Sequence, residues 1–146
     1  EAEQYLARFD RRYAGVRAYM DATRAAARER GYVETVYGRR LYLPDIRAGN
    51  NQRRQYAERT AINTPIQGTA ADVVKIAMIR VHAALGKERR DAKLLLQVHD
   101  ELVLEVGERD LAPVEALVKR EMEGAATLKV PLDVEVGHGR SWAEAH

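Results

Sequence analysis

Two acidic residues, Asp100 and Glu101, lie between two short apolar segments, residues 94–98 and 102–106. The segments have the length and composition of paired β-strands, so these acids, with His99 before them, are predicted at the tip of a hairpin. Tight hairpin turns favour Asn-Gly or Asp-Gly, whereas His-Asp-Glu contains no glycine. A turn that departs from this preference between ordinary strands is typical of a functional site. An ordinary exposed turn that carries solvated acids fits the position equally well.

A carboxylate held at the tip of a hairpin is suited to binding a divalent cation. Carboxylate oxygens are preferred ligands of magnesium, and the absence of Cys excludes disulfides, thiolate nucleophiles and Cys-type zinc sites. A site with two metal ions would handle phosphate by activating one oxygen and stabilising another. Because adjacent residues of an extended chain point to opposite faces, we expect Asp100 to be the ligand and Glu101 to be auxiliary.

A second group of polar residues, Arg59, Asn63 and Gln67, recurs at steps of four. On a continuous or slightly kinked helix this spacing places three hydrogen-bond donors on one face, and Gly68 and Thr69 then allow a close approach. The DNA minor groove offers acceptors at nearly the same place in every base pair, so such donors sense pair geometry without reading sequence. Taken alone, a polar helix face bonded to water or to a neighbouring loop is the simpler interpretation.

The charges are distributed unevenly along the chain. Residues 1–60 hold 13 basic residues, all Arg, and 8 acidic residues, whereas residues 61–146 hold 11 basic and 14 acidic residues. The net charge of +2 therefore combines +5 with −3. All seven Tyr lie in the first 60 residues, and Arg with Tyr can grip phosphates and stack on bases. Solvated Arg on helices, with Tyr half inside the core, is at least as plausible.

Hydrophobic periodicity predicts the elements that would position these residues. Helices are predicted over residues 1–30 with a break near Ala14-Gly15, over 50–62, from Pro65 to Gly86, and over 110–123. Strands are predicted at residues 32–36, 40–43, 94–98, 102–106 and 130–136. Helices packed on one side of an antiparallel sheet make an α+β fold.

The length and composition predict a folded globular chain. It has 146 residues, of which 46% are hydrophobic and 32% charged. No apolar run approaches the roughly 18 residues of a membrane span, and the N-terminal residues have neither the basic start nor the apolar stretch of a signal peptide. We therefore expect a cytoplasmic protein with no membrane partner.

Three long segments closely resemble the family-A DNA polymerases, the family of bacterial DNA polymerase I. They are residues 31–46, 59–72 and 97–106, and they occur in the order that the family has. The ending Trp142-Ala-Glu-Ala-His146 is also similar to the C-terminus of those proteins. The resemblance covers essentially all 146 residues.

The resemblance implies template-directed addition of deoxynucleotides to a primer 3′ end, in DNA replication and repair. It implies Mg²⁺ as cofactor, and primer–template DNA and deoxynucleoside triphosphates as partners. The catalytic and metal-binding residues that it implies are Asp100 and Glu101. The DNA-binding residues that it implies are Arg53 and Arg54 near the DNA backbone, Arg59, Asn63 and Gln67 in the minor groove, and His99 near the primer terminus. We expect Asp72 to position its helix.

The resemblance also implies an incomplete palm, an antiparallel hairpin with packed helices, joined to a helical N-terminal segment derived from the fingers. We expect the fingers-derived helices and hairpin in residues 1–48 and the palm portion in residues 49–146. The family's other metal-binding Asp and its triphosphate-binding helix belong to patterns that do not occur in this sequence. We therefore expect a monomeric C-terminal part of the enzyme that does not extend primers alone.

Two other functions are compatible with these features. A non-catalytic module that binds duplex DNA would use the basic, Tyr-bearing first half. A metal-dependent nuclease would share the carboxylate chemistry, but it ranks last because the remaining acidic ligands have no clustered spacing.

Overall fold

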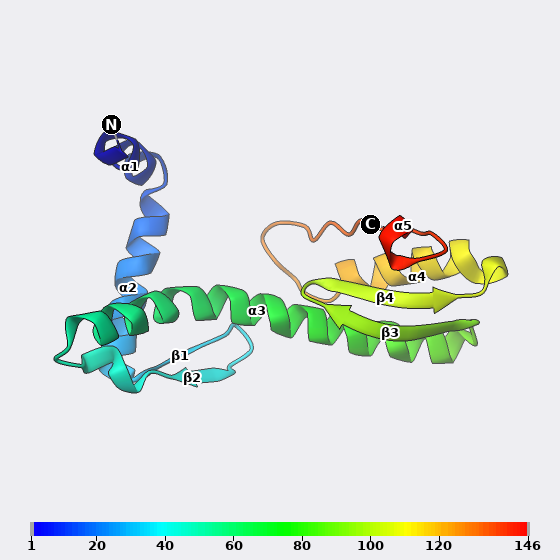
Figure 1. Cartoon of the computed structure of the whole chain (residues 1–146), viewed down its shortest axis with the longest axis horizontal. Helices are drawn as coiled ribbons and strands as arrows, with labels where there is room; N and C mark the ends of the chain where they lie inside the picture. The colour runs from blue at the N-terminus through cyan, green and yellow to red at the C-terminus, as the bar shows by residue number, and fades with distance from the viewer. Residues whose placement is uncertain (1, 146) are drawn as a thin grey trace. The chain divides into compact units, whose positions relative to one another are not determined.

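The computed structural model describes residues 2–145 and contains helices and two antiparallel hairpins, which confirms the α+β prediction (Figure 1). Glu1 and His146, which belong to the predicted first helix and the C-terminal motif, lie outside the described residues. None of the helices in residues 2–145 has the length and hydropathy of a membrane-spanning segment. The elements follow in the order α1 (Ala2–Arg12), α2 (Ala14–Arg30), β1 (Tyr32–Glu34), β2 (Arg40–Tyr42), the 3-10 helix η1 (Pro44–Arg47), α3 (Asn51–Glu88), β3 (Ala92–Val98), β4 (Glu101–Val106), the 3-10 helix η2 (Glu108–Asp110), α4 (Leu111–Glu123) and α5 (Trp142–Ala145).

The chain forms two compact units, Glu1–Thr69 and Ala70–His146, and α3 contains the division between them. The predicted division at residues 48 and 49 separates portions by their origin in a polymerase rather than by compactness. It stays a prediction.

In the first unit, the predicted break in the N-terminal helix is confirmed one residue earlier than expected. α1 and α2 separate at Tyr13, whose φ and ψ of −121° and 48° are not helical. α2 ends at Gly31, which adopts a left-handed φ of 79° and donates its N–H to the Ala27 carbonyl at 2.8 Å. A glycine at this position ends a helix without the steric cost that a Cβ would add.

The core of the first unit joins α2, the β1–β2 hairpin, η1 and α3. Ala27 of α2 and Ala61 of α3 are fully buried in the same apolar cluster. The cluster consists of Ala27, Val33, Leu43, Ile46, Ala57 and Ala61. Arg47 of η1 adds hydrogen bonds to the carbonyls of Arg28 and Glu29 at 2.5 and 2.6 Å, which satisfies backbone acceptors at the end of α2.

The turn of the β1–β2 hairpin lies directly against α3 at Gly68. A Cβ at Gly68 would stand 2.8 Å from Cγ2 of Thr35, closer than side chains tolerate. Arg39 Nη2 donates to the Gly68 carbonyl at 2.9 Å, and Thr69 Oγ1 accepts the Val36 N–H at 3.1 Å. The close approach expected at Gly68 and Thr69 is therefore made by the chain's own hairpin.

α3 corrects the prediction of two helices that meet near residues 63–65. It is one helix of 38 residues with Pro65 in its interior. Proline has no N–H, so the usual hydrogen bond to the Ala61 carbonyl cannot form, which normally costs about 3 kcal/mol. Buried residues on both sides of the proline, such as Ala57 and Val81, anchor the helix by packing that local sequence does not reveal.

In the second unit, the later part of α3 and α4 pack on the β3–β4 hairpin. The predicted paired strands and the predicted helix over residues 110–123 are confirmed, with α4 beginning one residue later. Val81 and Leu117 are the largest fully buried side chains. Around them lie Leu85, Val114 and Val118, with Leu102, Leu104 and Val106 from β4 packed against the cluster.

The last predicted strand, residues 130–136, is wrong. These residues form no strand, and among residues 2–145 the β3–β4 sheet has two strands only. A strand needs a neighbour for its N–H and C=O groups, and Pro131 lacks one of these donors. The alternation of apolar residues did not reveal whether a neighbouring strand was available to pair with this segment.

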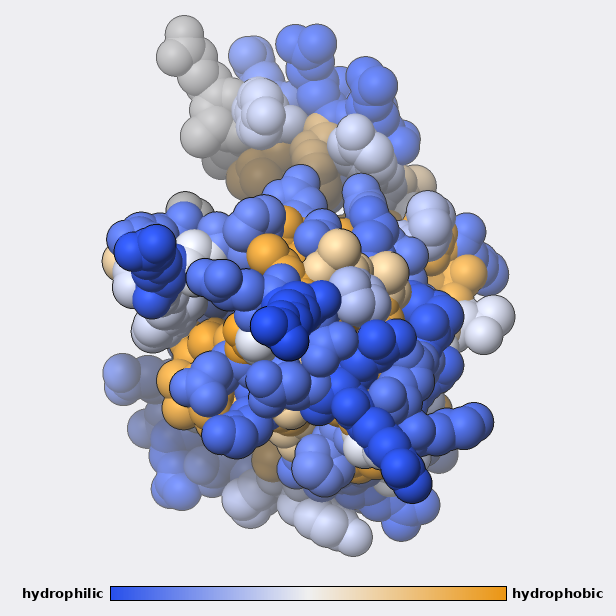
Figure 2. All heavy atoms as spheres, turned by 90° about the vertical axis from the view of Figure 1, so that its right-hand side faces the viewer, coloured by the Kyte–Doolittle hydropathy of each residue, from blue (hydrophilic) through white to orange (hydrophobic). Residues whose placement is uncertain are grey.

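Some apolar side chains of the second unit stay exposed. Leu95 and Leu96 of β3 each keep 52% of their surface, and Val130 keeps 66%. Figure 2 shows one face of the molecule on which hydrophobic side chains form small areas between hydrophilic ones. Scattered apolar residues of this kind are normal on protein surfaces.

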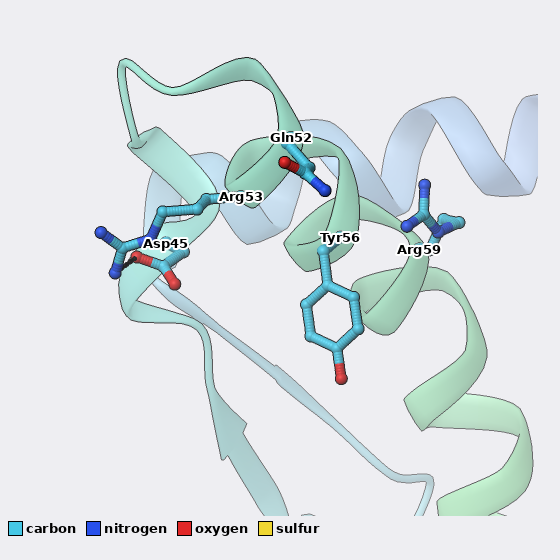
Figure 3. Close-up of a pocket in the computed structure, with 5 residues that line it drawn as sticks. All are labelled: Asp45, Gln52, Arg53, Tyr56 and Arg59. Carbon is cyan, nitrogen blue, oxygen red and sulfur yellow. Dashed lines mark ion pairs between the residues drawn. The ribbon is translucent and has the colours of Figure 1, made fainter.

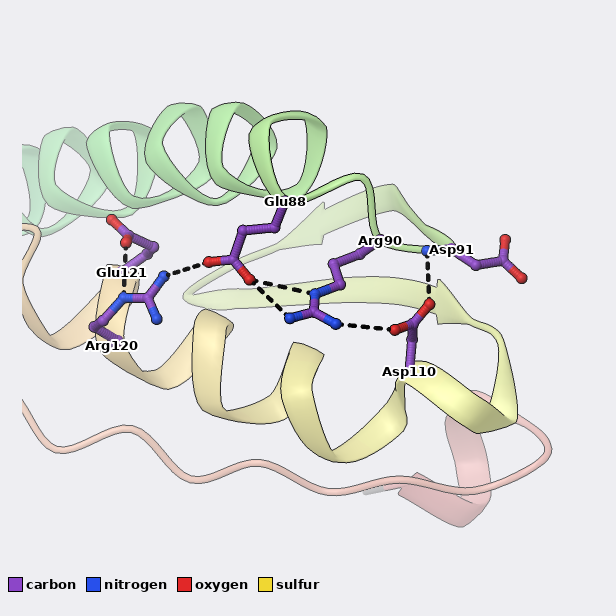
Figure 4. Close-up of polar contacts among 6 residues, drawn as sticks. All are labelled: Glu88, Arg90, Asp91, Asp110, Arg120 and Glu121. Carbon is purple, nitrogen blue, oxygen red and sulfur yellow. Dashed lines mark hydrogen bonds and ion pairs between the residues drawn. The ribbon is translucent and has the colours of Figure 1, made fainter.

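A charged network joins the end of α3 to the segment before β3, to η2 and to α4 (Figure 4). Arg90 donates to Glu88 at 3.1 Å through Nη2 and to Asp110 at 3.3 Å through Nη1. Asp110, directly before α4, also accepts the backbone N–H of Asp91 at 3.0 Å. Arg120 of α4 contacts Glu88 at 3.2 Å, so this carboxylate holds two guanidinium groups from different segments.

The donors of this network lower the pKa of three carboxyl groups. Hydrogen bonds from Arg90 and Arg120 lower the pKa of Glu88. The Asp91 N–H, followed by Arg90, lowers the pKa of Asp110. Arg120, followed by Arg80, lowers the pKa of Glu121. Each donor favours the ionised carboxylate over the neutral acid.

Candidate functional site

The acids predicted at a hairpin tip lie there in the structure. Val98 and Glu101 are paired across β3 and β4, so the connection between the strands is a two-residue turn of His99 and Asp100. His99 has a φ of 52°, in the left-handed region where the first position of such a turn favours glycine. Gln97 Nε2 donates to the His99 carbonyl at 3.3 Å and thereby ties the turn to β3.

Asp100 and Glu101 differ in their surroundings. Asp100 is exposed in the turn, whereas Glu101 is half-buried as the first residue of β4. Alternation along β4 places Glu101 and Val103 on the face opposite to Leu102 and Leu104, which pack on the core. The two acids therefore have different environments, because Asp100 lies in the turn and Glu101 is paired in the β3–β4 ladder.

The donor set at this tip suits part of a magnesium site. Within residues 2–145 no group of three or more His, Asp or Glu side chains is arranged to hold a metal ion. Magnesium keeps several waters and is usually bound by one or two carboxylates together with substrate phosphates. Asp100 and Glu101 supply oxygen ligands of this kind, but they do not form a complete cage.

The polar row on α3 is continuous. Arg59, Asn63 and Gln67 are all exposed, and the uninterrupted helix gives them the shared face that their spacing predicts. At 1.5 Å per residue, the row from Arg59 to Gln67 is about 12 Å long. Two separate helices that met near Asn63 would not have kept the three side chains on one face. The single helix α3 does keep them on one face.

The row of exposed polar side chains continues beyond Arg59 toward the start of α3. Gln52 and Tyr56 precede Arg59 at steps of four and three, and both are exposed. They are therefore on the same face of the helix. A pocket of about 300 Å³ lies at this end of the row and is lined by Asp45, Gln52, Arg53, Tyr56 and Arg59 (Figure 3). Helical spacing alone could have identified both added residues.

The two adjacent arginines predicted near the DNA backbone have different environments. Arg53 is exposed and forms an ion pair with Asp45 at 2.8 Å. Arg54 is half-buried and donates to the Ala48 carbonyl at 3.0 Å and to Asn51 Oδ1 at 2.9 Å. Arg54 thus holds the segment before α3, whereas the Arg53 side chain remains accessible. Asp72, expected to position the helix, is half-buried on α3.

The sequence matches DNA polymerase family A over residues 1–144. The chain belongs to this family. DNA polymerase I of Pseudomonas aeruginosa is 56% identical over 146 residues, which are 100% of this chain and 16% of that protein. The thermostable DNA polymerase I of Thermus filiformis is 51% identical over 145 residues, which are 99% of this chain and 17% of that protein.

A solved structure supports the same assignment. The POL domain of Pol1 from M. smegmatis, in complex with DNA primer-template and dNTP, superimposes with a TM-score of 0.96 at 47% identity. The match covers 99% of this family A chain and 26% of the solved chain. The predicted family and fold class are confirmed. This family A chain spans about a sixth of the length of the curated relatives.

Proposed function

We propose that this family A chain supplies part of the active site of a template-directed DNA polymerase that acts in DNA replication and repair. The observation that carries the proposal is the exposed Asp100 in a two-residue turn, on a hairpin held by the core of its unit. Membership in DNA polymerase family A supports the reaction class. Primer–template DNA and deoxynucleoside triphosphates are the proposed substrates.

In this proposal Asp100 and Glu101 hold Mg²⁺ at the hairpin tip, Asp100 as ligand and Glu101 in support. When bound, magnesium supplies the polarisation of the reacting oxygens that two-metal phosphoryl transfer needs. The strained turn fixes Asp100 relative to the strands, and His99 contacts the primer terminus. Arg59, Asn63 and Gln67 donate hydrogen bonds to minor-groove acceptors without selecting a sequence.

We further propose that the 146 residues alone do not extend a primer. Two carboxylates do not complete a pair of metal sites, and the pattern of the triphosphate-binding helix does not occur in the chain. The purified chain, given primer–template DNA, deoxynucleotides and magnesium, should show no incorporation above background. Incorporation that is sensitive to Asp100→Ala would contradict this expectation.

The main test is a graft of this chain into the Pseudomonas aeruginosa relative, in place of the segment that it matches at 56% identity. The graft should extend primers, and Asp100→Ala should reduce the rate to the background of the assay. Glu101→Ala should reduce it less, because its role is auxiliary. Glu105→Ala is the matched control, since Glu105 lies on the same hairpin and is paired with Lys93 at 3.5 Å.

Several outcomes of the graft experiment would contradict the proposal. An inactive graft that folds and binds DNA would exclude the proposed catalytic role of the chain. Retention of more than a few per cent of the rate by Asp100→Ala would remove the ligand role. Equal losses for Asp100→Ala and Glu101→Ala would remove the distinction between ligand and support.

A non-catalytic module that binds duplex DNA is the second candidate, and the exposed row on α3 favours it. Binding through arginine and phosphate would weaken steeply as salt rises, because counterions are released from the DNA. A salt titration of duplex binding by the 146-residue chain measures this dependence. An affinity that stays flat from low to moderate salt would exclude this mode of binding.

A further inference from the structure

The polar row on α3 is interrupted by a proline. Asn63 lies two positions before Pro65, and Gln67 lies two positions after it. Pro65 has no N–H for the Ala61 carbonyl, and a proline ring crowds the carbonyl four positions earlier, so a helix is prone to bend there. The alignment of Asn63 with Gln67 therefore depends on a part of α3 that the helix backbone alone does not fully hold.

Thr69 supplies an additional bond directly after this point. Its Oγ1 donates to the Pro65 carbonyl at 2.5 Å and accepts the Val36 N–H of the β1–β2 turn at 3.1 Å. A hydroxyl group has one proton to donate and two lone pairs, so it can make both bonds at once. Thr69 thus connects the proline to the hairpin.

The turn that meets α3 is itself held by hydrogen bonds. The Thr35 N–H donates to the Arg39 carbonyl at 2.9 Å, and the Gly38 N–H donates to the Thr35 carbonyl at 2.9 Å. Arg39 Nη2 adds a bond to the Gly68 carbonyl at 2.9 Å, and the Thr35 side chain lies against Gly68. The turn is therefore a fixed support on which this part of α3 rests (Figure 1).

Thr69 does not belong to the polar row. Residues two positions apart on an α-helix do not share a face, so Thr69 is directed to the hairpin while Gln67 is exposed elsewhere on the helix surface. Thr69 is half-buried. A change at Thr69 can therefore affect a ligand of the polar row only by moving its neighbours on α3, and Gln67 is the nearest member of the row.

We propose that Thr69 is a positioning residue for Gln67. By joining α3 to the β1–β2 turn, it keeps Gln67 aligned with the earlier part of the row across Pro65. A correct base pair presents its minor-groove acceptor at a regular place. A donor with a fixed position distinguishes this acceptor from one displaced in a mismatch, whereas a donor that is free to move can follow both.

The inference rests on the proposed polymerase function, because it takes the polar row to contact the minor groove of primer–template DNA. It adds to that function a role for the β1–β2 turn, which supports the selection of correctly paired primer ends.

The test uses the graft into the Pseudomonas aeruginosa relative. It compares kcat/KM for extension of a fully matched primer with that for primers that carry one mismatch near the 3′ end. Thr69→Val replaces the hydroxyl by a methyl group and should lower the matched-to-mismatched ratio roughly 2- to 12-fold, the range for loss of one hydrogen bond. Thr69→Ser keeps the hydroxyl and should stay within about twofold of the unsubstituted graft.

The ratio separates positioning from folding. A loss of folded protein lowers the rates on both primers by the same factor and leaves their ratio unchanged. Thr69→Ala removes the same hydroxyl with a better helix former, so it gives the measurement if Thr69→Val does not fold. A double-mutant cycle with Gln67→Ala supplies a second readout, because Thr69→Val should not lower the ratio further once the Gln67 amide is absent.

Thr60→Val is the matched control. Thr60 is half-buried like Thr69, and its Oγ1 donates to the Tyr56 carbonyl at 3.0 Å, the same bond to the carbonyl four positions earlier. Thr60 precedes Pro65 and lies about 12 Å along the helix axis from Gly68, where the turn meets α3. Its replacement should leave the ratio unchanged.

Other results would overturn the inference. An unchanged ratio in Thr69→Val, equal losses in Thr69→Val and Thr69→Ser, an equal loss in Thr60→Val, or a full additional loss in the Gln67→Ala background would each exclude positioning of Gln67 by Thr69. An active graft with any of these results removes the inference alone. An inactive graft removes the polymerase proposal and, with it, the inference.

Discussion

His99 adopts a backbone conformation that its residue type disfavours. Its φ of 52° brings Cβ close to the following carbonyl oxygen, a conformation that costs an L-residue about 1–2 kcal/mol. Residues held in such conformations are concentrated at functional sites, where the surrounding structure maintains the strain. The side chain is exposed, so packing does not explain why histidine rather than glycine occupies this position.

Substitutions at residue 99 should reveal this strain. His99→Gly removes the Cβ and should leave the chain at least as stable as before. His99→Val adds a β-branched side chain at positive φ and should lower the free energy of unfolding by about 1 kcal/mol or more. Urea denaturation of the 146-residue chain measures both effects.

The hydrogen bond from Gln97 to residue 99 is an internal control, because its acceptor is a backbone carbonyl that both variants keep. If His99→Gly were the less stable of the two variants, contacts of the imidazole rather than backbone strain would determine stability at the turn.

The contact between the β1–β2 hairpin and α3 shows how two elements share one glycine. Gly68 is unfavourable within a helix by about 1 kcal/mol relative to alanine. The same glycine lets Thr35, which is 5% exposed, lie against the helix backbone. Thr35 Oγ1 accepts the Arg39 N–H at 3.2 Å, so the side chain cannot rotate away without losing that bond.

Gly68→Ala should therefore destabilise the chain, although alanine is the better helix former. Overlap with Thr35 Cγ2 should cost about 1–3 kcal/mol and exceed the gain in helix propensity. Thr35→Ser removes Cγ2 and keeps the hydroxyl, so the double variant should be more stable than the two single effects predict. Urea denaturation of the four proteins completes a double-mutant cycle.

A stabilising effect of Gly68→Ala in the unsubstituted background would show that the hairpin moves away at little cost. A cycle without coupling would show that another atom, such as Arg39 Nη2 at 3.4 Å from the added Cβ, determines the penalty.

For the molecule as a whole, the distribution of charge along the sequence overstates the charge that is free to bind a ligand. Of the arginines in the first half, Arg39, Arg47 and Arg54 donate to backbone carbonyls of the same unit. Arg28 is paired with Glu58, and Arg40 with Glu34. Much of the positive charge therefore holds the fold, and Arg59 is a better candidate for contact with DNA than the count of arginines suggests.

The network around Arg90 should make unfolding depend on pH. Glu88, Asp110 and Glu121 have a lower pKa in the folded chain than when unfolded, so their contribution to stability is complete above the unfolded pKa of about 4. It is lost as the pH falls through the folded pKa values. The urea midpoint should therefore fall as the pH drops below about 4 and change little between about pH 6 and pH 7.

Arg90→Ala should flatten this dependence, because Arg90 donates to both Glu88 and Asp110. Arg109 of η2 is the matched control, since its side chain is exposed and forms no hydrogen bond or ion pair with residues 2–145. Arg109→Ala should keep the pH dependence of the unsubstituted chain. Equal slopes in the Arg90→Ala and unsubstituted chains would show that other carboxylates cause acid unfolding.

The sequence predicted the elements that depend on residues close to one another in the chain. The break between α1 and α2, the two hairpins and α4 follow from periodicity and turn residues within a few positions of one another. The continuity of α3 through Pro65 and the absence of a strand at residues 130–136 could not be predicted in this way. Both depend on what packs beside the segment, which is determined by residues far away in the chain.

The sequence by itself determined the family, the order of its motifs, and the positions of Asp100 and Glu101 at a hairpin tip, because each depends on residues close together in the chain. Only the tertiary structure decided which arginines are occupied, that the space beside Gly68 is filled by Thr35, and that Tyr56 borders a pocket with Arg53 and Arg59. A side chain's partner is set by distant segments brought together in folding. Spacing along one helix therefore identifies a face but not what lies against it.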